Sequence, residues 1–131
     1  MPNPLQGLSL EASLTVKSLA QSTIWYTEVL GFAVDRKHER EGKLIAVSLQ
    51  AGGVRLLITQ DDGAKGLDRV KGEGLSLQIT TRQSVDTIAA EIKQHGGVLD
   101  TEPTTLPWGA RIIRFRDPDG FRFTLSSTPA A

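Results

Sequence analysis

Residues that perform acid–base, nucleophilic or metal chemistry are few in this 131-residue chain, and they are widely spaced. There is no cysteine, which excludes disulfides, thiolate metal sites and a cysteine nucleophile. His38 stands in a charged run and is expected on the surface, while His95 is expected to contact the last carbonyls of a helix. Ser13, Ser48 and Ser76 have no histidine at a matching position, so no nucleophile–base pair is predicted.

Glu11 is the one candidate for general acid–base catalysis. It would act alone, because no electrophilic partner is placed to stabilise a developing enolate. The Gly52-Gly53 segment predicts a hairpin turn and not a phosphate loop, since neither a lysine nor a helix N-terminus follows it. Binding is therefore the first expectation and catalysis the second.

Four aromatic and basic residues are candidates for contacting a ligand. Trp108 stands in a proline-flanked loop, where it could stack on a planar or hydrophobic ligand or instead plug the core under the loop. Arg55 and Arg122 could hold an anionic group through their guanidinium forks, or simply reach solvent near a strand end. Phe115 could line a pocket or face the helices, because apolar and basic residues occupy both parities of its strand.

Charge and composition exclude several classes of partner. Fifteen basic and fifteen acidic residues give a formal net charge of zero, which argues against a nucleic-acid or membrane-surface partner. No apolar run approaches the roughly 20 residues that span a bilayer. Residues 1–4 lack the charged and apolar regions of a secretory signal. The sequence thus predicts a soluble, cytoplasmic protein.

Hydrophobic periodicity predicts the element order βαβββ twice over. In the first half we expect a strand over 8–16, a helix capped by Ser18 or Ser22 and ended by Gly31, and strands over 32–36, 44–50 and 54–59. In the second half we expect a strand over 75–80, a helix capped by Ser84 and ended by Gly96-Gly97, a strand that begins at 98, a loop over 101–108, and strands over 111–116 and 121–125.

The two halves align as an internal repeat within one domain, 1–131. Leu14 and Val16 match Leu77 and Ile79 at an offset of 63 residues, and the segment 53–58 matches 120–125 at an offset of 67. The repeats cover about 8–60 and 73–127, and a polar linker over 61–72 joins them. Two copies at so long a period indicate a duplicated supersecondary unit, and the two must associate to bury a core.

Two motifs make the chain resemble the vicinal oxygen chelate superfamily, the group of glyoxalase I, extradiol dioxygenases and bleomycin-resistance proteins. Trp25–Phe32 is similar to the family's FYxxvLGF, and Pro107–Gly109 with Asp117–Phe121 is similar to its wG…DPdGn. The resemblance implies an α+β fold in which two tandem βαβββ units form a curled mixed sheet with helices on its outer face. It also implies a homodimer whose cavity binds a small molecule.

Metal-dependent members of the family place four side chains in that cavity, one on the first and one on the last strand of each unit. The matching positions here are Glu11, Leu57, Gly74 and Thr124. Only Glu11 is a good ligand, and a first-row divalent ion needs roughly three or four. The resemblance therefore leads us to expect no metal and no other cofactor, with a divalent metal as the family's alternative.

The function predicted is metal-independent binding or sequestration of a hydrophobic or aromatic ligand in a dimeric cavity, as in glyoxalase/bleomycin-resistance-type proteins. The expected ligand-binding residues are Trp108, Arg55, Arg122, Gln78, Ser76, Thr124 and Phe115. The alternative is a lyase, isomerase or dioxygenase-like enzyme with a displaced metal site or acid–base chemistry at Glu11. A structural or regulatory dimer without a ligand is a third possibility.

Overall fold

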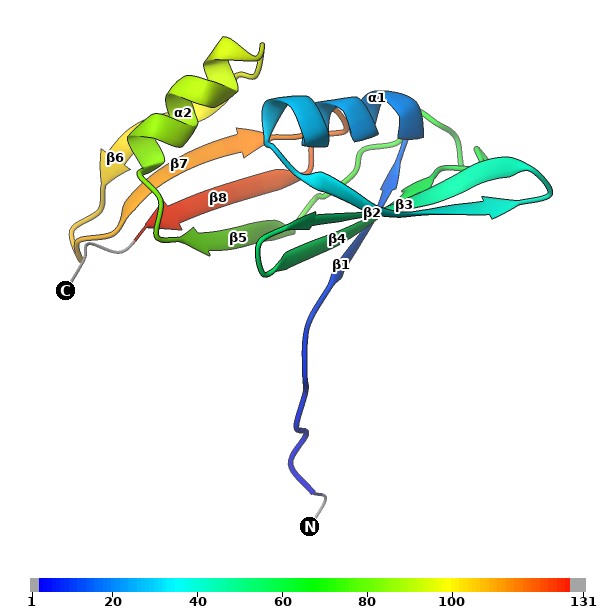
Figure 1. Cartoon of the computed structure of the whole chain (residues 1–131), viewed down its shortest axis with the longest axis horizontal. Coiled ribbons are helices and arrows are strands. Elements are labelled where there is room, and N and C mark those ends of the chain that lie inside the picture. The colour runs from blue at the N-terminus through cyan, green and yellow to red at the C-terminus, as the bar shows by residue number, and fades with distance from the viewer. Residues whose placement is uncertain (1–2, 128–131) are drawn as a thin grey trace.

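The computed structural model describes residues 3–127 and confirms the predicted α+β architecture of two βαβββ units (Figure 1). The first unit comprises β1 (Ala12–Val16), α1 (Leu19–Ile24), the π-helical turn η1 (Trp25–Val29), β2 (Ala33–Arg40), β3 (Lys43–Ala51) and β4 (Val54–Gln60). The second comprises β5 (Ser76–Thr81), α2 (Val85–Gln94), β6 (Leu99–Thr105), β7 (Arg111–Arg116) and β8 (Arg122–Ser127).

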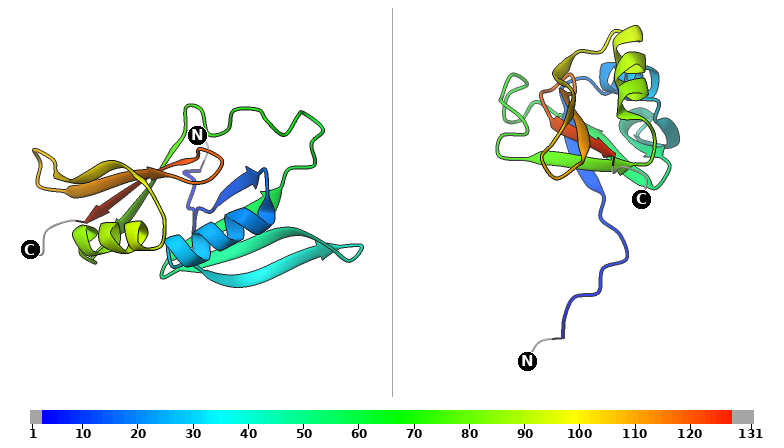
Figure 2. Two further views of the ribbon diagram at one scale, coloured as in Figure 1. Left: turned by 90° about the horizontal axis from the view of Figure 1, so that it is seen from above. Right: turned by 90° about the vertical axis from the view of Figure 1, so that its left-hand side faces the viewer.

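Each unit folds into one four-stranded mixed sheet. The strand orders are β1-β4-β3-β2 and β5-β8-β7-β6, so the two units share one topology. The first strand of each unit runs parallel to the last, and the other neighbours are antiparallel. Both helices cover the same side of the two sheets, and the other side carries no helix (Figures 1 and 2). We call this uncovered side the open face.

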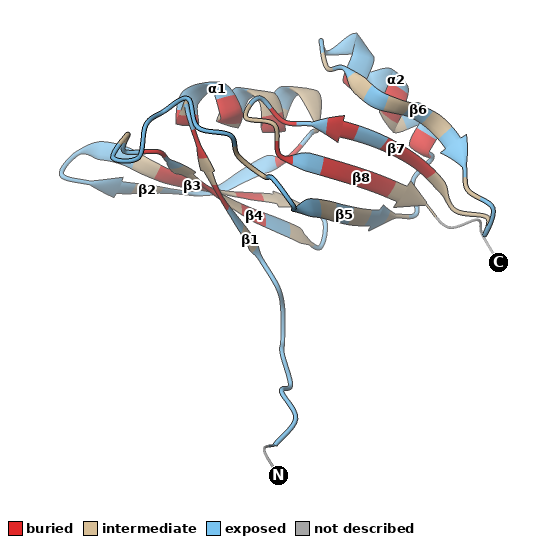
Figure 3. Ribbon diagram, turned by 180° about the vertical axis from the view of Figure 1, so that it is seen from behind, coloured by how far each residue is buried: buried red, intermediate tan, exposed pale blue. Residues whose placement is uncertain are grey.

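One hydrophobic core lies between the helices and the sheets and draws on both units. Alternate strand residues point into it, such as Leu14 and Val16 in β1 and Phe123 and Leu125 in β8. Figure 3 shows buried and exposed residues alternating toward the end of β7, whereas β8 has three consecutive buried residues because Thr124 is buried as well. Each fully buried side chain of this size stabilises the fold by roughly 1.5–3 kcal/mol.

Serine side chains begin both helices. The Ser18 Oγ accepts a hydrogen bond from the Gln21 N–H at 3.3 Å, which selects Ser18 over Ser22 as the first cap. The Ser84 Oγ accepts from the Thr87 N–H at 3.2 Å, as predicted. After η1, Gly31 takes a φ of 79°, the left-handed conformation that glycine adopts without strain.

The two motifs that carry the family resemblance meet where the units join. The Tyr26 hydroxyl donates a hydrogen bond of 2.7 Å to the Asp117 carboxylate, and both side chains are buried. The other oxygen of Asp117 accepts the N–H groups of Asp119 and Phe121, each at 2.9 Å. Burial raises the pKa of Asp117, and the three hydrogen bonds partly oppose that effect. The motifs therefore hold the units together.

A second polar contact fastens the linker to the first unit. The Lys71 ammonium lies 2.6 Å from the Asp61 carboxylate and also donates to the Thr15 carbonyl at 3.0 Å. Both charged side chains are buried. The hydrogen bond from Lys71 is the main cause that lowers the pKa of Asp61 to about 2. The polar linker thus contains a buried ion pair.

Three predicted boundaries are wrong by more than two residues. The strand predicted over 32–36 is β2, which continues to Arg40. The first strand begins at Ala12 and not at Leu8, and residues 3–11 project from the body without strand partners (Figure 1). The expected loop over 101–108 is instead occupied through Thr105 by β6. This strand contains Pro103, which an edge strand tolerates because one side of its backbone needs no partner.

The strand pairing also corrects the offset of the repeat. Leu57 in β4 opposes Ser13, and its counterpart Thr124 in β8 opposes Gln78. The first strands of the two units are therefore related by 65 residues and not by 63. A shift of two residues leaves every side chain on the same face, so hydrophobic alternation cannot detect it.

Candidate functional site

Six polar residues form a compact patch on the open face of the second sheet. Their neighbours Ile113, Phe115 and Phe123 belong to the core, so alternation directs the six side chains to the opposite side. Thr124 lies between Gln78 and Arg114 on the adjacent strands, and Arg122 lies between Ser76 and Arg116. We call these residues the arginine patch: Ser76, Gln78, Arg114, Arg116, Arg122 and Thr124.

The arginine patch is about the size of a small ligand. Neighbouring strands lie about 4.8 Å apart, and residues two apart on one strand are separated by about 7 Å. Thr124 is buried, whereas both Arg114 and Arg122 are exposed. Sequence analysis named four of the six residues, and the pairing of β5 with β8 brings those four together. It missed Arg114 and Arg116 because apolar and basic residues occupy both parities of β7.

Trp108 lies away from the arginine patch within one chain. Its loop is closed by the Leu106 N–H, which donates to the Ala110 carbonyl at 2.7 Å, and 77% of the residue is exposed. It does not plug the core. The loop precedes Arg111, which pairs with Ser127, so it lies at the far end of β8 from Arg122. Along β8 that end lies roughly 17 Å from Arg122 and roughly 10 Å from Thr124.

The other predicted ligand contacts lie on different surfaces. Phe115 is on the helix side, where it stacks on Phe123 with ring centroids 5.5 Å apart. Arg55 is on the open face of the first sheet, and its guanidinium lies 3.5 Å from the Asp35 carboxylate. The structure therefore divides the predicted set among four places: the arginine patch, the Trp108 loop, the helix side and the open face of the first sheet.

The four positions matched to the family's metal ligands do not lie opposite one another on paired strands. Glu11 is exposed and precedes β1, and Gly74 is exposed and precedes β5. Leu57 and Thr124 instead face Ser13 and Gln78 across the strands. Within residues 3–127, no three His, Cys, Asp or Glu side chains gather as metal ligands. Metal independence stays a prediction.

His38 corrects a prediction, because it does contact a serine. Its Nε2 lies 2.9 Å from the Ser48 Oγ on the open face of the first sheet, and the ring is half-buried. Register shifts beside Arg36 and Glu39 interrupt the alternation of β2, so periodicity could not place this histidine. In this contact histidine has the position of a general base and serine that of a nucleophile. No carboxylate within residues 3–127 hydrogen-bonds to the ring, however, so the third member of a triad is not in place.

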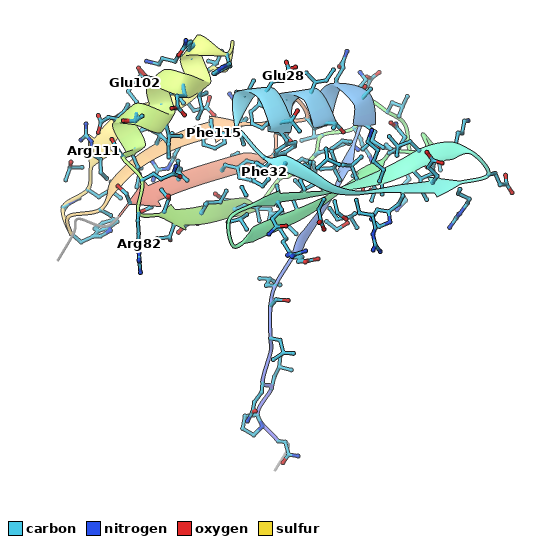
Figure 4. The ribbon with its side chains drawn as sticks, in the orientation of Figure 1. Glu28, Phe32, Arg82, Glu102, Arg111 and Phe115 are labelled. Atoms are coloured by element: carbon cyan, nitrogen blue, oxygen red, sulfur yellow. The ribbon has the colours of Figure 1, made fainter. Side chains whose placement is uncertain are left out.

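A cleft of about 910 Å³ lies on the other side of the sheets, where the units adjoin. Glu28, Phe32, Arg82 and Phe115 are among its lining residues, and Figure 4 shows Glu28, Phe32 and Phe115 near the junction of the units. His95 also lines it and places its Nδ1 2.7 Å from the Glu91 carbonyl, which confirms its predicted contact at the end of α2. The cleft shares only Phe115 with the predicted site. We therefore take the arginine patch as the candidate site.

The comparisons with known proteins identify the family. The model of the Glyoxalase/Bleomycin resistance protein/Dioxygenase superfamily matches residues 9–125, and the chain belongs to that superfamily. It has no significant match among curated protein sequences. No helix within residues 3–127 combines the length and apolar character needed to cross a membrane.

Solved structures share the fold at low sequence identity. TioX from Micromonospora sp. ML1 is 18% identical, with a TM-score of 0.72 over 94% of this chain and 98% of that one. The virulence protein STM3117 from Salmonella typhimurium is 22% identical, with a TM-score of 0.69 over 95% and 99%. A glyoxalase/bleomycin resistance protein/dioxygenase from Nocardioides is 19% identical, with a TM-score of 0.72 over 98% and 91%.

Proposed function

We propose that this protein binds a small hydrophobic or aromatic molecule on the open face, without a metal, in the manner of glyoxalase/bleomycin-resistance-type proteins. The observation that carries the proposal is the arginine patch, whose polar side chains converge on a surface that no helix covers. Arg114, Arg122, Gln78 and Thr124 make no side-chain hydrogen bond or ion pair with any residue of 3–127. The exposed side chains among them, Arg114, Arg122 and Gln78, are available to a ligand.

A second copy of the chain completes the cavity in this proposal. The projecting segment 3–11 exposes Leu5, Leu8 and Leu10 almost fully, and Trp108 is exposed at one end of the second sheet. So much accessible apolar surface is typical of an interface. Closure of two open faces on each other would cover it and would let Trp108 form a cavity wall that one chain alone cannot build.

A neutral aromatic probe tests this function. N-phenyl-1-naphthylamine should bind saturably to a homodimer, detected by the rise of its fluorescence, while light scattering reports the oligomeric state. Trp108→Ala should weaken binding, whereas Val98→Ala, which also truncates an exposed apolar side chain, should not. A monomer without saturable binding, or equal affinities for the two variants, would contradict the proposal.

A further inference from the structure

We propose that the arginine patch recognises an anionic group on the ligand, a carboxylate, sulfonate or phosphate, through Arg114, Arg116 and Arg122. This inference rests on the proposed function and adds the ligand's charge to it. The protein as a whole is neutral, so the local concentration of three guanidinium groups is not a consequence of composition.

The arginines occupy an arrangement that is unfavourable without an anion. Arg116 and Arg122 face each other directly across β7 and β8, and like charges in that relation destabilise a sheet. The carboxylate of Asp100 holds Arg116 through two contacts of 3.0 Å. No carboxylate within residues 3–127 pairs with Arg114 or Arg122. The patch therefore retains an excess of positive charge.

The first unit shows that the fold does not require these charges. Strand pairing makes Ser48 the counterpart of Arg114, and Gln50 the counterpart of Arg116. Arg122 alone has an arginine counterpart, Arg55, which is paired with a carboxylate. At these three positions the first sheet thus has two neutral side chains and one paired arginine, whereas the second has three arginines, of which only Arg116 is paired within residues 3–127. Stability of the fold does not explain this difference between the sheets, whereas binding of an anionic ligand does.

The geometry suits a single oxyanion. Arg114 and Arg122 are diagonal neighbours, separated by about 7–8 Å at the backbone, so two long side chains can reach one group between them. A guanidinium presents paired donors that match a carboxylate or phosphate. Thr124, beside Arg114, adds a hydroxyl donor, and Gln78 adds an amide. The guanidinium groups can only donate, and the hydroxyl and the amide can donate as well, which favours a ligand group that accepts.

Two probes that differ in charge test the inference. The anionic 8-anilinonaphthalene-1-sulfonate and the neutral N-phenyl-1-naphthylamine share one aromatic scaffold, and both report binding by fluorescence. We expect Arg122→Gln and Arg114→Gln each to weaken binding of the sulfonate about tenfold while changing binding of the neutral probe less than twofold. Arg122→Lys, which keeps charge but loses the fork, should fall between.

The control is Arg40→Gln, at the tip of β2 on the other sheet, which should leave both affinities unchanged. Removal of Arg122 should also raise the melting temperature of the ligand-free protein, because it relieves a repulsion. If both probes bind but the arginine variants do not discriminate between them, the anion inference is wrong and the proposed function stands. If neither probe binds, both fail. A lower melting temperature for Arg122→Gln would show a structural role and overturn the inference.

Discussion

Replacement of Tyr26 by phenylalanine isolates the hydrogen bond that joins the two units. The change deletes one hydroxyl and keeps the ring, whose contacts with Trp25, Phe32 and Phe123 have centroid distances of 4.9, 5.8 and 6.1 Å. A hydrogen bond to a charged group contributes about 1.5–3 kcal/mol, and the buried Asp117 keeps its two backbone donors. We expect the free energy of unfolding to fall by about 2 kcal/mol.

Urea denaturation followed by circular dichroism measures this loss. With an unfolding entropy of about 2.1 cal/mol/K per residue, the melting temperature should fall by about 7 °C. Ser22→Ala is the matched control, because it removes a longer contact of 3.4 Å to Asp119 at the same junction. Its cost should be smaller. A loss below about 0.5 kcal/mol for Tyr26→Phe would refute the view that this contact holds the units together.

The pH dependence sharpens the same test. Burial raises the pKa of Asp117 in the folded state, so its contribution to stability is complete below the unfolded pKa and is lost as the pH rises through the folded pKa. The Tyr26 hydroxyl opposes that loss by binding the charged form. The cost of Tyr26→Phe should therefore be largest at neutral pH and shrink once Asp117 is protonated. A cost that does not change with pH would mean that Asp117 carries no charge at neutrality.

Three further predictions concern the linker, the junction and the metal. Lys71→Met should raise the pKa of Asp61 from about 2 and move acid unfolding to higher pH. The reason is that the stability contributed by Asp61 is present above its unfolded pKa and is lost as the pH falls. An unchanged midpoint of acid unfolding would contradict the ion pair. Gly97→Ala would place a Cβ 2.5 Å from Ile92 and 2.7 Å from Val29, so urea unfolding should show that the free energy of unfolding falls by about 1–3 kcal/mol. Gly53→Ala, where the Cβ would meet open space, should lower it little. Equal losses for the two variants would count against close packing at Gly97. Treatment with EDTA should leave binding of N-phenyl-1-naphthylamine unchanged, and stoichiometric metal that disappears in Glu11→Ala would overturn metal independence.

Local pattern was enough to predict most of the fold. Alternation placed β3, β4 and β7 to within about one residue at each end, and serine chemistry predicted the cap at Ser84 and narrowed the first cap to Ser18 or Ser22. The duplication and the family likeness could also be recognised, because each rests on short local patterns that can be compared without knowing which segments pack together. Strand ends were less predictable, as Pro103 in β6 shows, because whether a strand lies at an edge is a property of the whole sheet.

The amino-acid order alone was sufficient to establish the repeated βαβββ unit, the apolar face of the regularly alternating strands β1, β5 and β8, and the candidates Arg122 and Thr124. Folding in three dimensions was needed to show that Gln78 faces Thr124, that His38 reaches Ser48, and that Tyr26 bonds to a turn of the other unit. The physical reason is the two-residue period of a strand. This period specifies the face of the sheet on which a side chain lies, but it does not change when the register shifts by an even number of residues. It also carries no information about which distant strand pairs with a given strand.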